Sequence, residues 1–301
     1  MNGVLILDKP ADFTSFDVVA VARGLTREKK IGHTGTLDPM ATGVLPLLLG
    51  KAAKAADLLV DTDKTYRAGF RLGEQRETGD VTGEVVRRDD VPISREMLEQ
   101  AARGFLGTIT QVAPMYSAVS VGGKRLYQLA REGVQVERPA RQVTIYDLAI
   151  EAYDPAAREG VLTARCSKGT YIRVLLEDLG AACGSCGTMT ALRRTAACGF
   201  DQSETVTLDR LKELAAAGEI ATVLRPVESL FRGLPAVRVS PAQARRFCNG
   251  GGLDLGRLRL PEVSLPAGER LRVYEEDRAF LGLGAVDPDR GELRFLKKFT
   301  D

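Results

Sequence analysis

The sequence predicts an α+β protein with a second, smaller and mostly β module at its C-terminal end. Strand-like and helix-like segments alternate along the 301 residues, of which 44% are hydrophobic and 27% charged, a balance typical of a globular protein. Two consecutive strand-like segments, 142–152 and 161–167, have the spacing of a hairpin. This favours a mixed, largely antiparallel sheet over a doubly wound parallel one. Near 233–235 the character changes, and short strands follow.

Apolar spacing predicts the elements of the larger part. The apolar run 3–8 ends at Lys9 and a proline, as a strand followed by a turn does. Apolar residues of 17–25 recur at helical spacing, and Thr14 and Ser15 precede them as candidate caps. By the same criteria we expect strands at 44–49, 65–72, 142–152, 161–167 and 190–194, and helices at 51–60, 94–105, 124–132, 168–179 and 208–217.

The last part of the chain is predicted to form a domain of its own. Ser240 is followed by a proline, which is a strong helix start. The glycines at 250–252 predict the end of that helix. Strands are expected at 270–274, 280–286 and 292–297. We therefore predict two domains, 1–232 and 233–301, the second within the usual size range of a small domain.

Composition excludes several kinds of site. His33 is the single histidine, so zinc or haem sites that need several histidine ligands are impossible. Cys183 and Cys186 form one C-x-x-C motif with no second pair at finger spacing. We therefore expect Cys183 and Cys186 to be small buried residues near a helix end, rather than ligands of a structural zinc ion or a redox dithiol. No segment has the G-x-x-x-x-G-K-[ST] spacing of a phosphate-binding loop.

Cysteine content and the absence of long apolar runs indicate the cellular compartment, whereas the net charge does not indicate a binding partner. No apolar run approaches the roughly 18 to 20 residues that a membrane span needs, and the N-terminus lacks the features of a signal peptide. Five cysteines are an odd number that fits free thiols, so we expect a cytoplasmic protein. The net charge is +2, and 233–301 holds 12 Lys+Arg against 10 Asp+Glu. RNA binding would require folding to gather basic residues on one face.

The glycine-rich segment 32–43 is the strongest candidate for a functional loop. It is too polar and too interrupted for a regular element, yet it leads directly into the apolar run 44–49. Pro39 restricts Asp38 to extended conformations, so that one carboxylate is presented at a loop tip. Spacing alone leaves three roles open for Asp38: nucleophile, general base, or turn-former, the last being the commonest role of an Asp-Pro pair.

A series of motifs resembles the TruB family of tRNA pseudouridine synthases. The string GHTGTLDPMATGVLP at 32–46 is similar to the family signature, and NGVLILDKP at 2–10 to its opening motif. Further motifs follow in family order: KTYR at 64–67 with LG at 72–73, TGD at 78–80, MYSA at 115–118, GKRLY at 123–127, SKGTYIR at 167–173 and LRR at 192–194. The resemblance is dense over 2–215, and 233–301 resembles the family's PUA-type RNA-binding domain more loosely.

The resemblance implies that uridine 55 in the T loop of tRNA is isomerised to pseudouridine: the base is detached at N1–C1′, turned and rejoined through C5. Asp38 matches the essential aspartate, which attacks ribose C1′ or promotes elimination to a glycal. Arg173 matches the arginine that pairs with this carboxylate and keeps it ionised. Tyr66 matches the tyrosine that stacks on the target base and moves its proton. The reaction is redox-neutral and hydrolyses nothing, so neither a cofactor nor a metal is implied.

The same resemblance implies a set of substrate-binding residues. His33 matches the histidine that props the flipped-out nucleotides, while Tyr171 and Leu192 resemble residues of the pocket wall. Lys9 is expected to support the active-site loop rather than to take part in chemistry. The implied partner is the T arm of tRNA, with no membrane and no obligatory protein partner, so a monomer is expected.

Two other classes of function were weighed. An RNA-binding or RNA-folding module whose catalysis is secondary is the alternative, and Asp38→Asn separates it from the enzyme. The substitution would abolish pseudouridine formation in an enzyme and change little in a pure binder. A carbohydrate-active enzyme is set aside, because it would need two carboxylates flanking a glycosidic bond and no second acid lies in a comparable motif.

Overall fold

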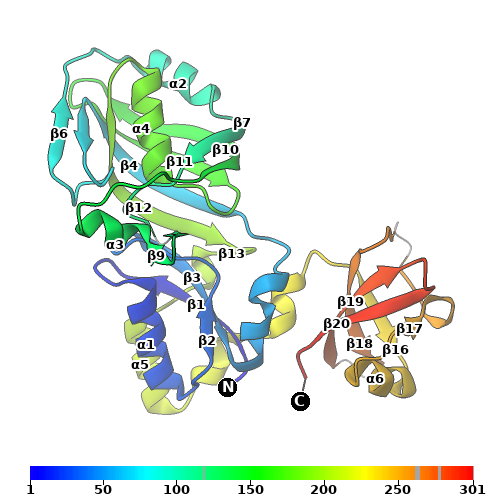
Figure 1. The fold of residues 1–301 in the computed structure, drawn as a ribbon. Helices are drawn as coiled ribbons and strands as arrows, with labels where there is room; N and C mark the ends of the chain where they lie inside the picture. Colours follow the sequence, from blue (N-terminus) through cyan, green and yellow to red (C-terminus); the bar gives the residue numbers. More distant parts are fainter. Residues whose placement is uncertain (118, 262–264, 277–278, 301) are drawn as a thin grey trace.

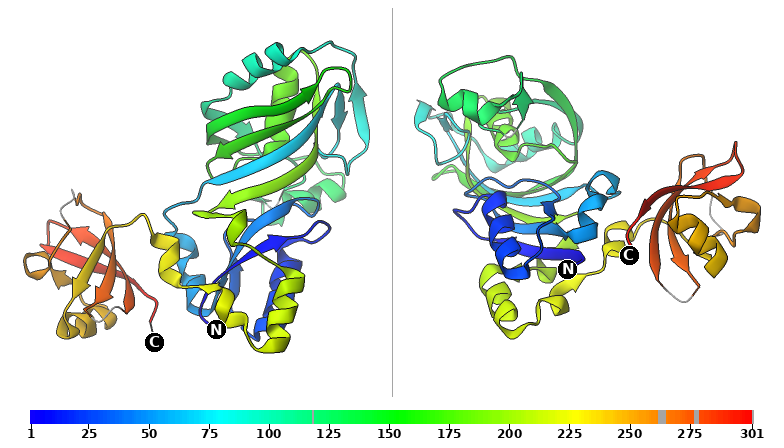
Figure 2. Two further views of the ribbon diagram at one scale, coloured as in Figure 1. Left: turned by 180° about the vertical axis from the view of Figure 1, so that it is seen from behind. Right: turned by 60° about the horizontal axis from the view of Figure 1, so that its bottom comes forward.

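The computed structural model describes residues 1–117, 119–261, 265–276 and 279–300. In this part of the chain the larger sheet has 11 strands and the smaller sheet, at the C-terminal end, has five (Figure 1). The small sheet lies beside the lower end of the larger part, so that the molecule is elongated and bent (Figure 2). The predicted α+β class with a small β module is confirmed.

The larger sheet is mixed and largely antiparallel, as predicted. Its continuous path runs in the order β14 (Val206–Thr207), β1 (Gly3–Lys9), β3 (Thr42–Leu49), β12 (Gly187–Ala197), β4 (Lys64–Leu72), β11 (Glu159–Cys166), β10 (Ala140–Asp154) and β7 (Gly107–Val112). Beside this path, β2 (Ile31–His33) pairs with β3, β13 (Phe200–Asp201) with β12, and β15 (Leu224–Arg225) with β1. The pairs β1–β14 and β3–β12 are parallel, and the other pairs of this path are antiparallel.

Three apolar cores lie on this sheet, and α-helices cover two of them. Helices α1 (Ser15–Thr26) and α5 (Leu208–Ala217) pack on the β1–β3 half, where Val18 and Leu211 join one core. Helices α2 (Arg95–Arg103) and α4 (Ile172–Ala182) pack on the β4–β11–β10 half, where Leu98 and Leu175 join the other (Figure 1). Strand β12 lies between the two halves, parallel to β3 on one side and antiparallel to β4 on the other.

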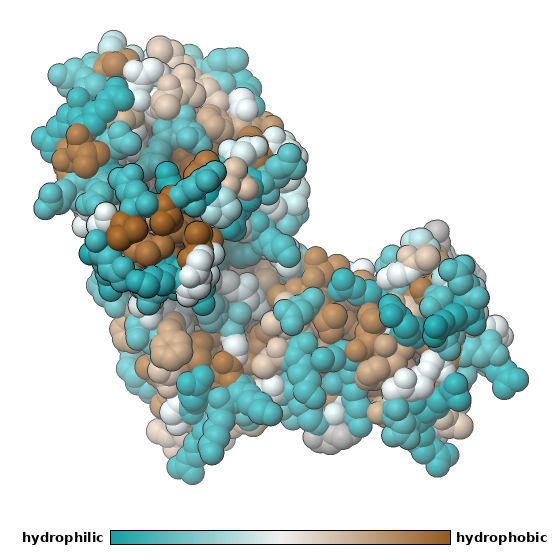
Figure 3. All heavy atoms as spheres, in the orientation of Figure 1, coloured by the Kyte–Doolittle hydropathy of each residue, from teal (hydrophilic) through white to brown (hydrophobic). Residues whose placement is uncertain are grey.

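Smaller elements surround the sheet. They are the ribbons β5 (Glu74–Arg76) with β6 (Val85–Arg88) and β8 (Ser120–Val121) with β9 (Lys124–Arg125), the helix α3 (Leu126–Arg131), and the 3₁₀ helices η1 (Gly50–Leu58), η2 (Gln202–Glu204), η3 (Ile220–Val223) and η4 (Val227–Phe231). The space-filling view shows an apolar patch over α3 and β9 within a mostly polar surface (Figure 3). Each helix in the described ranges falls short of the length and apolar content that a membrane crossing requires.

The C-terminal sheet has a core of its own and is packed against the larger part. Its order is β16 (Ala236–Val239), β18 (Arg270–Glu275), β19 (Phe280–Asp287), β20 (Glu292–Lys298) and β17 (Leu253–Asp254), with α6 (Pro241–Cys248) and η5 (Leu255–Arg257) beside it. Phe231 of η4 contacts Phe280 and Phe299, with ring centroids 6.3 and 5.6 Å away. The Nη1 atom of Arg270 donates a hydrogen bond of 3.0 Å to the carbonyl oxygen of Leu58.

Two of the predicted helices differ from expectation in type or in extent. A helix was expected at 51–60, and the helix found there, η1, is of the 3₁₀ type, which places the buried Ala52 and Ala55, three residues apart, on one face. The helix expected from 168 begins only at Ile172. The side chain of Gln111 holds the preceding residue by both backbone groups, accepting from Tyr171 N (3.0 Å) and donating to its carbonyl oxygen (3.2 Å).

Other boundaries moved by a few residues or were missed. The helix expected at 124–132 covers Leu126–Arg131 only, because the two residues before it pair as β9. The strand expected at 190–194 extends over Gly187–Ala197. The strands β5, β6 and β7 were not predicted. Of these, β6 is exposed throughout, so its sequence carries no alternation of apolar and polar residues.

Candidate active site

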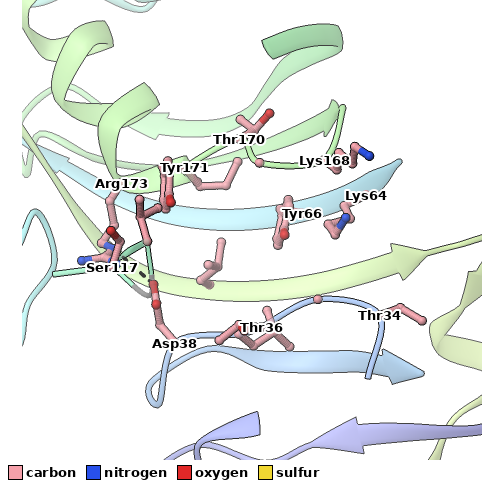
Figure 4. Close-up of a pocket in the computed structure, with 16 residues that line it drawn as sticks. Thr34, Thr36, Asp38, Lys64, Tyr66, Ser117, Lys168, Thr170, Tyr171 and Arg173 are labelled. Atoms are coloured by element: carbon pink, nitrogen blue, oxygen red, sulfur yellow. Dashed lines mark ion pairs between the residues drawn. The ribbon is translucent and has the colours of Figure 1, made fainter. Parts of the chain in front are cut away.

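A cavity of about 360 Å³ opens where the loop before β3 faces β4 and the start of α4 (Figure 4). The loop contributes residues 34–38, and β4 contributes Lys64 and Tyr66. The opposite wall consists of residues 168–173 with Ser117 and Val119, and Leu192 of β12 completes the lining. A space of this size, with polar groups converging in it, is typical of a site for a small molecule or one nucleotide base.

The loop that carries Asp38 is held from below by the end of β1. Lys9 is fully buried, and its Nζ donates hydrogen bonds to the carbonyl oxygens of Pro10 (2.8 Å), Phe13 (2.5 Å) and Pro39 (3.0 Å). The backbone N of Leu37 donates to Oγ of Ser15 at 2.9 Å. Lys9 therefore contacts the loop from beneath and does not line the cavity.

Arg173 connects Asp38 to a second carboxylate. Its Nε lies 3.1 Å from Asp38 Oδ2, and its Nη1 lies 3.6 Å from Asp80 Oδ2. Nη1 also donates to the carbonyl oxygen of Thr78, and Nη2 to that of Tyr116, each at 2.8 Å. The guanidinium is 6% exposed, so its position is set by these contacts rather than by solvent. We call Asp38, Arg173 and Asp80 the arginine–aspartate network.

The charges of this network act on one another. Burial raises the pKa of the Asp38 carboxyl, the Arg173 guanidinium counteracts that rise, and Asp80 adds to it. Burial lowers the pKa of the Lys9 ammonium to about 8, although the Asp38 carboxylate opposes the shift. A carboxylate with a raised pKa is a more basic oxygen than an exposed aspartate, and an adjacent guanidinium keeps it oriented.

Tyr66 lies in the middle of the cavity wall on β4. Its side chain is almost fully buried, and burial raises the pKa of its phenol. On the neighbouring strand Arg194 pairs with it in register, so both side chains lie on the same face of the sheet. In Figure 4 Tyr66 lies between Asp38 and Arg173 at one end and Lys64, Lys168 and Thr34 at the other.

The structure brings five of the seven predicted site residues to this cavity. Asp38, Tyr66, Tyr171, Arg173 and Leu192 line it, whereas Lys9 and His33 lie outside its wall. Leu192 also belongs to the apolar core on the β4 half.

His33 immediately precedes the cavity wall and is tied into the loop that forms it. Its Nδ1 accepts a hydrogen bond of 3.3 Å from the backbone N of Gly35. Burial lowers the pKa of its imidazole, which favours the neutral ring.

Sequence reasoning missed three charged residues that the structure places here. Asp80 is the second carboxylate at Arg173 and accepts hydrogen bonds from Thr78 and Thr82. Lys64 lines the cavity, and Arg194 lies fully buried behind it. A signal existed for Lys64: side chains alternate along a strand, so Lys64 shares the face of Tyr66. Asp80 and Arg194 each occurred in a quoted motif, but nothing in their spacing indicated a role.

The C-x-x-C pair lies away from this cavity. Cys183 and Cys186 are buried free thiols at the end of α4, and Sγ of Cys186 donates to Asp89 Oδ2 at 3.3 Å. Within the described residues no group of three or more His, Cys, Asp or Glu side chains is arranged to hold a metal ion.

Three family models match consecutive parts of the chain. The model described as "TruB family pseudouridylate synthase (N terminal domain)" matches residues 23–172. "tRNA pseudouridylate synthase B C-terminal domain" matches residues 173–232. "Pseudouridine synthase II TruB, C-terminal" matches residues 235–294.

Relatives of known name are similar over nearly the whole length. The tRNA pseudouridine synthase B of Azoarcus sp. (strain BH72) is 45% identical over 284 residues, which cover 94% of this chain and 91% of the relative. That of Alkaliphilus oremlandii (strain OhILAs) is 38% identical over 297 residues, which cover 99% of this chain and 97% of the relative.

Solved structures share the fold at lower identity. A chain in the crystal structure of a Cbf5-Nop10-Gar1 complex has a TM-score of 0.76 and 24% identity, over 99% of this chain and 85% of that chain. A chain of an H/ACA RNP bound to a substrate RNA containing 2′-deoxyuridine has a TM-score of 0.76 and 22% identity, over 99% and 85% of the two chains. At these identities the likeness concerns the fold alone.

Proposed function

The chain belongs to the TruB family of pseudouridine synthases, as its motifs predicted, and from this premise we propose that it converts uridine 55 in the T arm of tRNA to pseudouridine. One observation carries the proposal. The Asp38 carboxylate, its Arg173 partner and the Tyr66 ring share one cavity of about 360 Å³. Such a cavity can take one base extruded from a folded RNA. The relatives described above are named as tRNA enzymes, which supports tRNA as the substrate class.

The proposed chemistry begins at the carboxylate of Asp38. One of its oxygens either forms a bond to ribose C1′ or removes the proton from C2′ to give a glycal. On both routes the N1–C1′ bond breaks and its electron pair leaves with the base. The base then turns, C5 bonds to C1′, and the Asp38 carboxylate is restored. The proton lost from C5 is balanced by the proton gained at N1, so no cofactor is consumed.

Arg173 and Asp80 hold that carboxylate in place. The guanidinium donates toward Asp38 from one side while Asp80 and two backbone carbonyl oxygens fix it from the other. Asp38 thus meets the ribose in one orientation, which lowers the entropic cost of reaching the transition state. We assign Arg173 the role of keeping Asp38 ionised and directed.

The aromatic and apolar side chains of the wall would hold the base. Tyr66 offers a ring face for stacking and a phenol that can exchange the proton of C5. Tyr171 and Leu192 close the cavity around the base. We assign His33, which lies outside the cavity, the role of supporting the nucleotides that flipping displaces, since its neutral ring suits stacking.

We propose that residues 1–232 are the catalytic domain and residues 233–301 a PUA-like RNA-binding domain, the whole acting as a monomer. The C-terminal sheet exposes arginines from separate segments, among them Arg238, Arg245 and Arg259. Contacts to phosphates release counterions, so tRNA affinity is expected to fall as salt rises. Removal of 233–301 is expected to weaken binding and leave the chemistry possible, and an affinity insensitive to salt would contradict this assignment.

The test is conversion of an unmodified tRNA transcript. The purified protein is expected to form pseudouridine at position 55, mapped by chemical probing of the RNA. Asp38→Asn is expected to abolish conversion while tRNA binding is retained. Asp209→Asn, at an exposed aspartate of α5, is the matched control and should convert the RNA at the wild-type rate.

The same experiment judges the alternative of an RNA-folding module. That function requires Asp38→Asn to leave every RNA-dependent activity intact. A wild-type protein that binds tRNA without making pseudouridine would overturn the proposed enzyme, and a conversion at another uridine would overturn the proposed position.

A further inference from the structure

Two buried cations at the end of the cavity away from Asp38 form no ion pair with a carboxylate among the described residues, and the nearby Asp63 pairs with Arg165. Lys64 is 9% exposed and Arg194 is fully buried. The Nζ of Lys64 donates to the carbonyl oxygen of Thr62 at 2.8 Å. The guanidinium of Arg194 donates to the carbonyl oxygens of Val44 (2.7 Å) and Gly35 (3.2 Å). Within the described ranges no carboxylate forms an ion pair with Lys64 or Arg194.

The two cations converge at Gly35. A Cβ atom placed on Gly35 would lie 3.6 Å from Arg194 Nη1 and 3.9 Å from Lys64 Nζ. In the described part of the chain, Arg194 Nη1 and Thr34 Oγ1 are buried without a hydrogen bond of good geometry, as is Ser117 Oγ on the opposite wall of the cavity. The phenol of Tyr66 lies beside Arg194, and the thiol of Cys198 lies beside Thr34. We call Thr34, Lys64 and Arg194 the cationic cluster. Unpaired polar groups in a protein interior are costly, and Thr34 and Lys64 line the cavity, where a bound group can pair with them.

The position of the cluster indicates which part of a nucleotide it meets. In Figure 4 Tyr66 lies between Asp38 and Lys64. If Asp38 reaches ribose C1′, as the proposed function requires, a base stacked on Tyr66 would extend toward Lys64. The RNA backbone stays with the ribose at the Asp38 end. Thr34 and Lys64 line the cavity at this end, whereas Arg194 is fully buried and does not line it, so a bound group meets Thr34 and Lys64 directly and Arg194 through its charge alone. The far edge of the base, with its two carbonyl oxygens, suits hydrogen-bond donors in this position.

We propose that the cationic cluster stabilises the negative charge that the uracil carries once it is detached from the ribose; this inference rests on the proposed function. When the N1–C1′ bond breaks, its electron pair remains on N1 and is delocalised onto O2 and O4. The base is then an anion, whichever of the two routes Asp38 takes. Lys64 and Thr34 donate hydrogen bonds to it, and Arg194 lowers its energy through the adjacent field. No proton needs to be transferred for this effect.

The experiment compares two leaving groups in single-turnover reactions at saturating enzyme. One tRNA carries uridine at position 55 and the other 5-fluorouridine, whose fluorine withdraws electrons and stabilises the detached anion by itself. Nuclease digestion and chromatography of the RNA measure the loss of the N-glycosidic bond over time. Lys64→Met is expected to slow cleavage about 100-fold with uridine, the loss typical of removing one donor to a developing anion. With 5-fluorouridine the loss is expected to be less than about 10-fold.

Matched variants separate this role from a structural one. Lys64→Arg keeps the charge and should recover most of the rate. Lys64→Met should not lower the thermal midpoint, because it removes a buried charge without an acidic partner. Lys212→Met, at an exposed lysine of α5, should leave both rates unchanged.

Each other outcome has a definite meaning. Equal losses with the two leaving groups, or no loss, overturn the role of the cluster and leave the proposed function standing. A defect seen only as weaker tRNA binding, with the saturated rate unchanged, also overturns it and points to a phosphate contact. If the wild-type protein breaks the N1–C1′ bond of position 55 in neither RNA, the proposed function and this inference are both refuted.

Discussion

The two ends of the catalytic cavity differ in how completely their charges are paired before RNA arrives. At one end Arg173 contacts two carboxylates and two carbonyl oxygens. At the other end Lys64 and Arg194 contact carbonyl oxygens, and Arg194 Nη1 has no hydrogen bond of good geometry to the described residues. The first end is organised in the free protein, whereas the second, by our proposal, is completed by the substrate. Positioning a nucleophile calls for the former, and neutralising a transient anion calls for the latter.

The largest contrast is expected in the effects of replacing Arg173 and Lys64, one buried cation from each end, on the free energy of unfolding. Arg173→Met leaves two carboxylates without their cation, so the free energy of unfolding should fall by about 3–5 kcal/mol and activity should be lost. Lys64→Met removes a charge that has no acidic partner, so stability should be unchanged or higher. Urea denaturation at pH 7 measures both.

Arg173→Lys is the control for charge at the Asp38 end, and it should recover part of the stability but not the separate contacts that Nε, Nη1 and Nη2 make. Equal destabilisation by Arg173→Met and Lys64→Met would show that the two ends are not different in kind.

A second contrast concerns the support beneath Asp38 and depends on pH. The pKa of Lys9 is lowered by burial from 10.5 to about 8. As pH rises above 8, the folded protein releases this proton before the unfolded chain does, so folding is increasingly favoured up to about pH 10.5. The stability of the wild type relative to Lys9→Met should therefore rise by about 1.4 kcal/mol per pH unit in that window. Urea titrations of both proteins at pH 7, 8, 9 and 10 measure the difference, and a flat difference would contradict the assignment.

How far the sequence predicts the molecule also differs between the two ends. The residues of the Asp38 end could be predicted because Asp38, Tyr66 and Arg173 each lie in a motif that resembles one of the family. Asp80 was missed, although its motif was quoted, because only folding brings residues 78–80 against the start of α4. Arg194 was missed for a different reason: a basic residue in a strand is expected to face solvent, and nothing local reveals that Arg194 is buried. Lys64 was missed although the alternation of side chains along β4 places it on the face of Tyr66.

The same limit explains the errors in the fold. Long apolar elements such as β1, β4 and α1 were predicted because their patterns repeat over several residues. The extended segment before α4 was not, because the contact that holds it comes from Gln111, far away in the chain. Element types thus followed from local patterns, and departures from them followed from tertiary contacts.

A third contrast tests how Asp80 acts on the paired end. The Asp80 carboxylate contributes to the raised pKa of Asp38, so Asp80→Asn should lower that pKa. The reaction needs the ionised Asp38, and activity falls as pH drops through its pKa. The acid limb of the single-turnover rate should therefore move to lower pH, although the maximal rate falls because Arg173 is held less firmly. The exposed Asp90→Asn is the control, and its acid limb should match the wild type. A limb that moves to higher pH would contradict this electrostatic role.

The smallest effect on the cleavage rate is expected from a substitution at Gly35, the loop residue that lies against Lys64 and Arg194. A Cβ on Gly35 would lie 3.1 Å from Lys64 Cε, so Gly35→Ala should displace the lysine by a few tenths of an ångström. This displacement should slow cleavage of the N1–C1′ bond about 10-fold and leave tRNA binding unchanged. Gly32→Ala, where nothing lies within 4 Å of the added atom, should stay within about 2-fold of the wild-type rate. If Gly35→Ala acts by displacing Lys64, its effect should be smaller in the Lys64→Met background than in the wild type, because neighbouring substitutions that disturb one interaction are not additive. Full additivity of the two rate losses would show that Gly35 serves the loop alone and that the cationic cluster does not depend on it.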